Sequence, residues 1–230
     1  MNFSKWMGPL TLCAGCSFAG LAQAADDGWY LVAFGGEASA QNVSQSAQDQ
    51  QLVDLFGSVG LTPVDVTSTL DDSDTGFGLA AGYQVNEHFA AELAYVDLGD
   101  ISYQAAGTVT DGVSNFVSDF ALSQNASGPV FSFLGILPIG DRFSVFGRVG
   151  LALMDVEADA NVTIDGAATA SDAETNRSNG VYGIGGEFSL SDSFGIRVEW
   201  NRYAGVGSDD ITGDVDIDLI SLGLRYNFRY

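Results

Sequence analysis

Ser221-Leu-Gly-Leu-Arg-Tyr-Asn-Phe-Arg-Tyr230 alternates between apolar residues and small or polar ones. The apolar positions are Leu222, Leu224, Tyr226 and Phe228, and the positions between them are Ser221, Gly223, Arg225 and Asn227. This period of two residues is typical of a β-strand, whose successive side chains point to opposite faces. A continuous apolar face opposite a small or charged face fits the wall of a membrane barrel, with lipid outside and water or packed polar groups inside.

The composition favours the same class of protein. The chain has 230 residues, enough for one domain, with 29 glycines and only 17% charged residues. After residue 24 no stretch reaches the roughly 18 uncharged apolar residues that a spanning helix needs. The sequence therefore predicts an all-β fold: a membrane-spanning, antiparallel, up-and-down β-barrel.

The N-terminus has the features of a secretory signal peptide. Lys5 precedes an apolar run that ends at Leu21, and the small residues that follow predict cleavage between Ala24 and Ala25. We therefore expect a signal peptide at residues 1–24 and a barrel at residues 25–230.

Both cysteines, Cys13 and Cys16, lie inside the predicted signal peptide, so their Cys-x-x-Cys spacing does not predict a metal or redox site. Lipidation of Cys16 stays open as an alternative, which an acyl group in the intact mass would reveal. A secretory signal, a mature chain without cysteine and alternating strands together indicate the outer membrane of a Gram-negative cell.

Acidic residues dominate the charge of the chain. There are 30 Asp plus Glu against 8 Lys plus Arg, and because Lys5 is the only lysine, seven arginines remain after cleavage. Such a surface repels nucleic acids and anionic bilayers at any distance that salt does not screen. No nucleic-acid partner is expected.

Alternating segments recur along the chain as hairpins. The first strand, 29–34, is apolar on both sides, so its facing stays undecided. Three strand pairs follow, with short turns at 85–88, 138–141 and 191–193, and the terminal strand makes eight. Polar excursions connect the other ends of the strands, at 37–74, 98–128, 155–179 and 203–215.

This asymmetry is typical of outer-membrane barrels, which have short periplasmic turns and long extracellular loops. An even number of strands then places both termini in the periplasm. Outward-facing aromatic residues cluster near the short-turn end, as an interface girdle would: Tyr83, Phe89, Phe143, Phe188, Phe194, Tyr226 and Phe228.

Two strands carry acids where their lipid-facing phase continues past the apolar segment. These acids are Asp155, Glu157 and Asp159 in one strand and Asp214, Asp216 and Asp218 in the other. Because a carboxylate facing hydrocarbon is costly, we interpret both as strands that continue beyond the bilayer with acids outside. A β-bulge near Leu219 is the alternative.

The inward face changes character along the barrel. Near the loop end it is apolar, and this set forms either a capping core or a pocket for a small apolar solute: Phe120, Leu122, Val156, Ala158, Val215, Ile217 and Leu219. Further along it carries charges, which predict a lumen network of Glu92, Arg148, Glu187, Arg197, Glu199 and Arg225. Eight strands enclose a lumen just wide enough for side chains, so these charges form a plug or line a narrow pore.

Three segments resemble the OmpA-like transmembrane domain, a family of eight-stranded outer-membrane barrels. They are Phe89-Ala-Ala-Glu-Leu-Ala-Tyr95, Leu137-Pro-Ile-Gly140 through Gly147-Arg-Val-Gly150, and Gly195-Ile-Arg-Val-Glu-Trp200. The resemblance implies an inward network of Glu, Arg and Lys, to which Glu92, Arg148, Glu187 and Arg197 correspond. Leu134 stands near the family's lysine, so arginines are expected to be the only cations.

The resemblance also implies an assembly signal and partners. Ser221, Gly223, Tyr226 and Phe228 match the signal read by the barrel-assembly machinery, although Arg229 and Tyr230 extend past it. The implied partners are that machinery, periplasmic chaperones, outer-membrane lipid and lipopolysaccharide, with the protein a monomer. No peptidoglycan-binding domain is expected after the last strand.

Enzymatic activity is not expected. The single histidine, His88, lies in a predicted short turn, where it cannot activate a nucleophile. No cofactor or metal site is predicted, because the loop acids at 71–74 and 208–210 lack the spacing of a calcium loop, although weak divalent bridging to lipopolysaccharide stays open. We expect a structural or surface-interaction role; a narrow channel, a conduit for small apolar solutes and an adhesin are the alternatives.

Overall fold

A computed structural model describes residues 28–206 and 215–228. The predicted signal peptide with its cleavage site at Ala24 and Ala25 lies outside the described residues, as do the acids at 208–210, Asp214, Arg229 and Tyr230. Across the described ranges, no helix is both long enough and apolar enough to cross a membrane.

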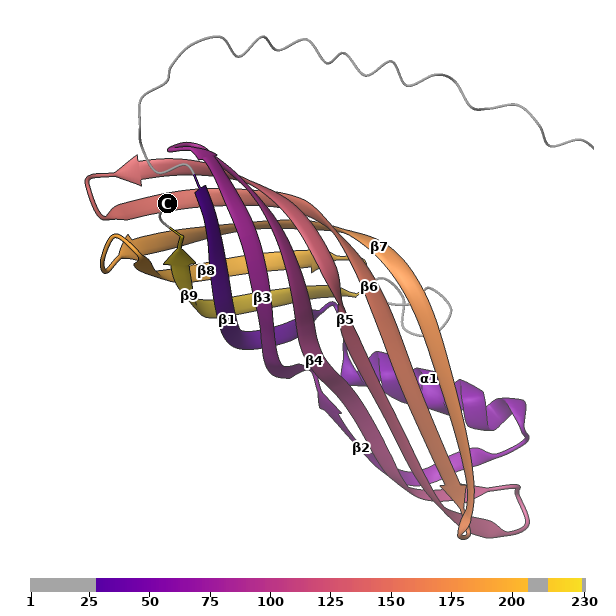
Figure 1. Cartoon of the computed structure of the whole chain (residues 1–230). Helices are drawn as coiled ribbons and strands as arrows, with labels where there is room; N and C mark the ends of the chain where they lie inside the picture. Colours follow the sequence, from indigo (N-terminus) through magenta and orange to yellow (C-terminus); the bar gives the residue numbers. More distant parts are fainter. Residues whose placement is uncertain (1–27, 207–214, 229–230) are drawn as a thin grey trace, which may run out of the picture.

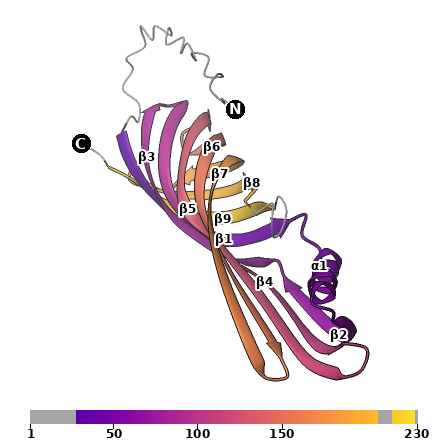
Figure 2. The same ribbon diagram turned by 90° about the vertical axis from the view of Figure 1, so that its right-hand side faces the viewer.

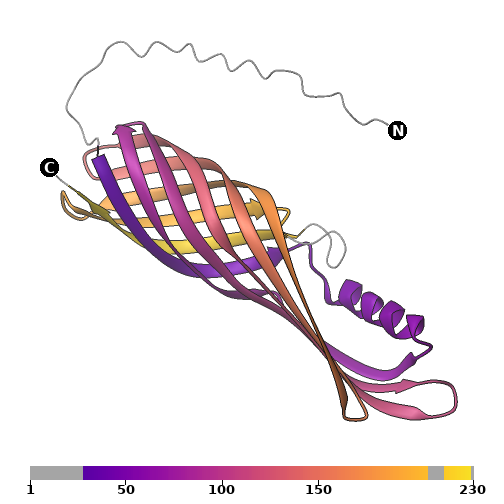
Figure 3. The same cartoon turned by 45° about the vertical axis from the view of Figure 1, so that its right-hand side comes forward.

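Eight antiparallel strands form a closed ring, which confirms the predicted fold class (Figure 1 and Figure 3). The ring strands pair in the order in which they occur in the chain, and the last strand pairs with the first. The ring strands are β1 (Gly28–Gln41), β3 (Ser73–Asn86), β4 (Phe89–Thr110), β5 (Asn115–Ile139), β6 (Phe143–Ile164), β7 (Ala167–Ser189), β8 (Phe194–Ala204) and β9 (Asp216–Asn227).

The wall of the ring has an apolar outer face. In β1, whose facing the sequence left undecided, Tyr30 and Val32 point inward and are 1% exposed, whereas Trp29 and Leu31 are about half exposed on the outside. The aromatic residues of the predicted girdle are all exposed on the outer face: Tyr83, Phe89, Phe143, Phe188, Phe194, Tyr226 and Phe228. Tyr83 also packs against Trp29 of the neighbouring strand in a T-shaped contact, with ring centroids 5.2 Å apart.

Strands β4 to β7 continue far beyond the ring as a protruding sheet (Figure 2). The prediction of loops at 98–128 and 155–179 is therefore wrong, because most of these residues are strand. The β6–β7 turn consists only of Asp165 and Gly166, whose φ values of 48° and 84° suit a two-residue hairpin. The sequence suggests loops here because Ala, Ser, Thr and Asp occur on both faces of these strands. The regular alternation of apolar and polar residues that identifies a strand is therefore weak.

The predicted polar excursion at 37–74 is likewise wrong as a loop. It contains the end of β1, a helix α1 (Gln45–Ser58) and a ninth strand, β2 (Thr62–Asp71), which pairs with β4. Ser44 caps the helix by accepting a hydrogen bond from the Ala47 amide at 3.3 Å. Residues 52–56, Leu-Val-Asp-Leu-Phe, are an apolar patch within this otherwise polar stretch of the sequence.

Helix α1 lies along one face of the protruding sheet (Figure 2). Leu52 and Phe56, four residues apart and therefore on one helical face, form a second hydrophobic core with Tyr103, Ala105 and Val109 of β4. Phe120 and Leu122 of β5 pack against this second core. The protruding sheet, here residues 62–71, 100–110, 115–125, 155–164 and 167–179, thus folds around its own apolar contacts.

A β-bulge marks the point where β4 leaves the ring. The register of β4 against β5 shifts between Asp97 and Asp100, with Gly99 between them at φ 73°. Asp74 fixes this corner, since its carboxylate accepts hydrogen bonds from the amides of Thr75 at 2.7 Å and Asp100 at 2.9 Å. Beyond the bulge β4 exchanges β3 for β2 as its neighbour.

The polarity of the strands inverts beyond the ring. Asp155, Glu157 and Asp159 are exposed, while Val156 between them is buried. The register of β9 against β1 runs unbroken from Asp216 to Asn227, which excludes the alternative of a bulge near Leu219. The inward residues Val156, Val215, Ile217 and Leu219 belong to the main hydrophobic core, and Ala158 is partly buried.

We expect Leu52→Ala to loosen α1 and β2 without opening the ring. Leu52 is 4% exposed, and truncating a buried leucine costs about 2–3 kcal/mol. Cleavage by a protease within residues 42–72 should therefore accelerate by about 30-fold or more, since proteolysis follows the population of the open form. Val53→Ala, on the 43% exposed neighbour, is the matched control and should leave the rate unchanged. Equal rates for both variants would contradict the packing of α1.

Candidate functional site: the charged interior of the barrel

All six predicted lumen residues point into the ring. Each is at most 8% exposed, and they come from β4, β6, β7, β8 and β9: Glu92, Arg148, Glu187, Arg197, Glu199 and Arg225. Three carboxylates thus face three guanidinium groups, and the cations of this lumen network are all arginines. Leu134, which stands near the family's lysine, is 1% exposed and lies opposite Arg148 in the strand register.

Glu92 is the centre of the lumen network. Its carboxylate accepts hydrogen bonds from Arg148 at 2.5 Å, from Arg197 at 2.6 Å and from the Tyr30 hydroxyl at 2.8 Å. A buried carboxylate is stable only when it is paired and hydrogen-bonded. Here three donors from three different strands satisfy it.

Two further carboxylates flank this centre. Towards the short-turn end Glu187 accepts from Arg197 and Arg225, both at 3.1 Å. On the other side Glu199 lies 3.1 Å from Arg148 and 3.2 Å from Arg197. Arg197 therefore contacts all three carboxylates and links the two halves of the lumen network.

Aromatic rings complete the packing. The guanidinium carbon of Arg197 lies 4.9 Å from the centre of the Phe146 ring and 5.7 Å from the centre of the Tyr30 ring. The guanidinium carbon of Arg225 also contacts Tyr30, at 3.8 Å from the ring centre. The sequence did not single out Tyr30 or Phe146. Tyr30 was missed because β1 is apolar on both faces, so the sequence does not show which face points inward. Phe146 could have been found, because it lies two residues before Arg148 and therefore on the same, inward face of β6.

The outer ends of the lumen network are also hydrogen-bonded. Arg225 donates to Gln84 at 2.6 Å and to Asn227 at 2.7 Å, and Glu199 accepts from Asn201 at 2.9 Å. Next to Arg225, the ring opens at the short-turn end into a cavity of about 1000 Å³. This cavity is lined by polar residues that include Gln84, Glu187 and Arg225.

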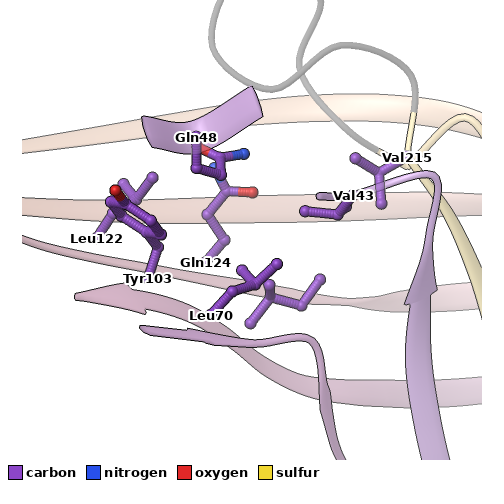
Figure 4. Close-up of a pocket in the computed structure, with 8 residues that line it drawn as sticks. Val43, Gln48, Leu70, Tyr103, Leu122, Gln124 and Val215 are labelled. Carbon is purple, nitrogen blue, oxygen red and sulfur yellow. The ribbon is translucent and has the colours of Figure 1, made fainter. Parts of the chain in front are cut away.

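A second cavity lies beneath α1, where the ring meets the protruding sheet (Figure 4). Its volume is about 20 Å³, and Val43, Leu70, Tyr103, Leu122 and Val215 are among the residues that line it. Such a volume holds about one water molecule. Among the described residues, the apolar side chains around this cavity leave only this volume between them. Burial and a 2.6 Å hydrogen bond to Asp49 raise the pKa of Tyr103 to about 12, so its hydroxyl stays protonated.

The remaining candidates lie away from the lumen network. His88 is in the β3–β4 turn, with its ring 3.4 Å from Glu87 and more than half exposed. Throughout residues 28–206 and 215–228, no three His, Cys, Asp or Glu side chains are grouped so as to hold a metal ion. On β9, Ser221 points inward and Gly223 pairs with Phe34 of β1. Tyr226 of β9 and Phe228, one residue past the end of β9, are 39% and 38% exposed on the outside. Their role as an assembly signal stays a prediction.

A closed ring of eight antiparallel strands, apolar outside and filled with paired charges inside, defines a small barrel of the outer-membrane class. The sequence profile of the OmpA-like transmembrane domain matches residues 24–230, and the chain belongs to this family.

Known relatives are outer membrane proteins of Gram-negative bacteria. The chain is 27% identical to outer membrane protein A of Salmonella typhi over 158 residues, 68% of this chain and 41% of that protein. It is 26% identical to outer membrane protein P5 of Haemophilus influenzae over 168 residues, 66% of this chain and 43% of that protein. The chain thus spans about two fifths of the length of these relatives. Among solved structures, Neisserial surface protein A is similar with a TM-score of 0.43 and 16% identity, covering 87% of this chain and 97% of that one.

Proposed function

We propose that this protein is a plugged outer-membrane barrel with a structural and surface-interaction role and no enzymatic activity. The observation that carries the proposal is the lumen network, in which Arg197 contacts three carboxylates from three strands across the interior. Three positive and three negative side chains balance one another in the narrow lumen of an eight-stranded barrel. An ion entering this lumen would have to displace paired charges.

The proposal includes an orientation. The short turns would face the periplasm and the protruding sheet the exterior, with both termini periplasmic, as in other barrels of this design. The exposed acids Asp155, Glu157 and Asp159 support this, because they lie beyond the apolar band, where water solvates them. Outer-membrane lipid would cover the apolar wall, lipopolysaccharide would surround the outer rim, and the protein would be a monomer.

The proposal also includes the assembly route. Periplasmic chaperones and the barrel-assembly machinery would deliver and insert the chain. Support comes from the end of β9, where Tyr226 and the following residue but one, Phe228, lie on the outer face with ring centroids 5.1 Å apart. β9 also forms the closing seam with β1, so a signal there would be read before the ring closes.

A narrow channel is the competing function, favoured by the cavity of about 1000 Å³ that opens the lumen at the short-turn end. Conductance across planar bilayers separates the two. For a plug we expect no steady, saturable conductance from the wild-type barrel, since Glu92 and Arg148 are paired at 2.5 Å. Glu92→Gln and Arg148→Ala test the lumen, and Asp155→Asn, on the exposed face, is the control. Steady wild-type conductance that either lumen variant alters, while the control does not, would contradict the plug.

A further inference from the structure

The protruding sheet has a strand edge without a neighbour in the described part of the chain. β8 joins β7 only between Gly180 and Ser189, so residues 167–179 of β7 pair with β6 on one side alone. Asn179 marks the boundary, because its side-chain amide donates to the carbonyls of Ala204 and Gly205 at the end of β8. Figure 3 shows β7 running past the ring along the border of the protruding sheet.

The hairpin turn fixes which backbone groups face this edge. In a two-residue turn the flanking residues, here Ile164 and Ala167, form a hydrogen-bonded pair, and such pairs then alternate along the ladder. Residues 167, 169, 171 and onward by twos therefore bond to β6. The amides and carbonyls of Ala168, Ala170, Asp172, Glu174, Asn176 and Ser178 face the open edge.

The segment lacks several of the features that keep another strand away from a sheet edge. Natural sheets protect their edges with lysine, proline, bulges or covering elements. Residues 167–179 contain neither lysine nor proline, and the β6–β7 register is continuous from Phe143–Phe188 to Ile164–Ala167, without a bulge. The one basic residue of the segment, Arg177, pairs with the buried Met154 and so lies on the inner face, opposite to the face of Asp172 and Glu174. The residues from Ala167 to Glu174 are all exposed.

The charges beside the edge define the partner. Glu157 of β6 lies directly opposite Glu174 of β7, and Asp159 lies opposite Asp172, all on the outer face. Like charges in directly opposed positions are destabilising. A neighbouring strand with lysine or arginine on this face would compensate both pairs, whereas an acidic strand would add to the repulsion.

We propose that residues 167–179 of β7 bind an extended basic polypeptide segment, which adds to the protruding sheet as a further strand. Backbone hydrogen bonds would supply the pairing, and basic side chains at alternate positions would lie against Asp172 and Glu174. The inference rests on the proposed function for its biological setting, since the edge is accessible to other molecules only if the protruding sheet faces the exterior.

A second copy of this chain fits the edge less well. Antiparallel pairing of two β7 edges about Ala173 would place Asp172 of one copy opposite Glu174 of the other, twice in each dimer. The two like-charge pairs already present in each copy would thus be joined by two more across the dimer. In this register the edge selects against a second copy and in favour of a basic strand.

The test uses the full chain, refolded in detergent micelles, and a fluorescent peptide, Lys-Thr-Lys-Val-Lys-Thr-Lys. A peptide with glutamate in place of lysine is the comparison. Fluorescence anisotropy should show saturable binding of the basic peptide alone, weakening as salt increases. Infrared spectra with a 13C-labelled peptide should show that it becomes β-strand when bound.

Two variants separate backbone pairing from charge. Ala170→Pro removes an amide that faces the open edge and leaves the β6 ladder intact, so binding should be lost while the barrel stays folded. The double variant Asp172→Asn, Glu174→Gln should weaken binding by about fivefold or more. Asp119→Asn, on the outer face of β5 away from the edge, is the matched control.

Three results would overturn the inference: no binding of the basic peptide, full binding by the Ala170→Pro variant, or dimerisation of the protein through this edge. These outcomes are independent of conductance. A barrel that conducts ions and binds the peptide would refute only the proposal of a plugged lumen. A barrel that neither conducts ions nor binds the peptide would refute only the proposal of peptide binding at the β7 edge.

Discussion

Replacing Arg197 by alanine is expected to lower the free energy of unfolding by about 3–5 kcal/mol. Arg197 is 2% exposed and contacts Glu92, Glu187 and Glu199 at 2.6 to 3.2 Å. Its removal leaves three buried carboxylates with two arginines, so one buried negative charge lacks compensation. The loss is a large part of the 5–15 kcal/mol that typically stabilises a folded domain.

Urea unfolding of the barrel in lipid vesicles, followed by the gel shift of the folded form, measures this loss. Glu92→Gln combined with Arg197→Ala is the informative control, because it removes one charge of each sign and keeps the remaining network balanced. We expect the double variant to recover part of the stability that the single variant loses. A single variant as stable as the wild type would show that the buried charges do not hold the barrel together.

Gly36→Ala is expected to prevent the ring from closing, with a cost of about 3 kcal/mol or more. Gly36 lies in β1 between Gly76 of β3 and Ser221 of β9. A Cβ atom at this position would lie 1.8 Å from the carbonyl oxygen of Ile220 and 2.6 Å from the Cα of Ser221. Both atoms belong to the backbone of β9, so relief requires that the seam between β1 and β9 separate.

The yield of folded, heat-modifiable barrel after insertion into vesicles tests this expectation. Gly135→Ala is the matched control, since a Cβ atom on Gly135 of β5 meets nothing within 4 Å. We expect the control to fold like the wild type and the Gly36 variant to remain largely unfolded. Equal yields would mean that the seam has room that the structure does not show.

The ring could be predicted from sequence because its signals are local. Alternation such as that of Leu222, Leu224 and Tyr226 assigns lipid and lumen faces residue by residue, and the same alternation placed Glu92 and Arg197 inside. The protruding sheet could not be predicted in this way. Residues 167–179 carry alanine, polar and charged side chains, and a strand without a large apolar face resembles a loop.

The candidate site shows the same division. The charged members of the lumen network are conspicuous in an apolar strand, so the sequence identified all six. Tyr30 was hidden by the apolar residues on both sides of β1, although it donates to Glu92 and lies against Arg225. Helix α1 was not predicted because its two buried apolar residues, Leu52 and Phe56, pack against Tyr103 and Phe120, which lie on strands far away in the sequence.

By itself the sequence determined the class of fold, the facing of most strands and the identity of the buried charges, because each follows from a repeat of two residues or from chemistry at a single position. The tertiary structure decided which carboxylate meets which arginine, where β4 leaves the ring and which edge of β7 stays open. These depend on register and on contacts between residues far apart in the chain, such as Arg197 and Glu92 or Gly36 and Ser221. A local sequence pattern cannot predict these pairs, because the partners come together only when the ring closes.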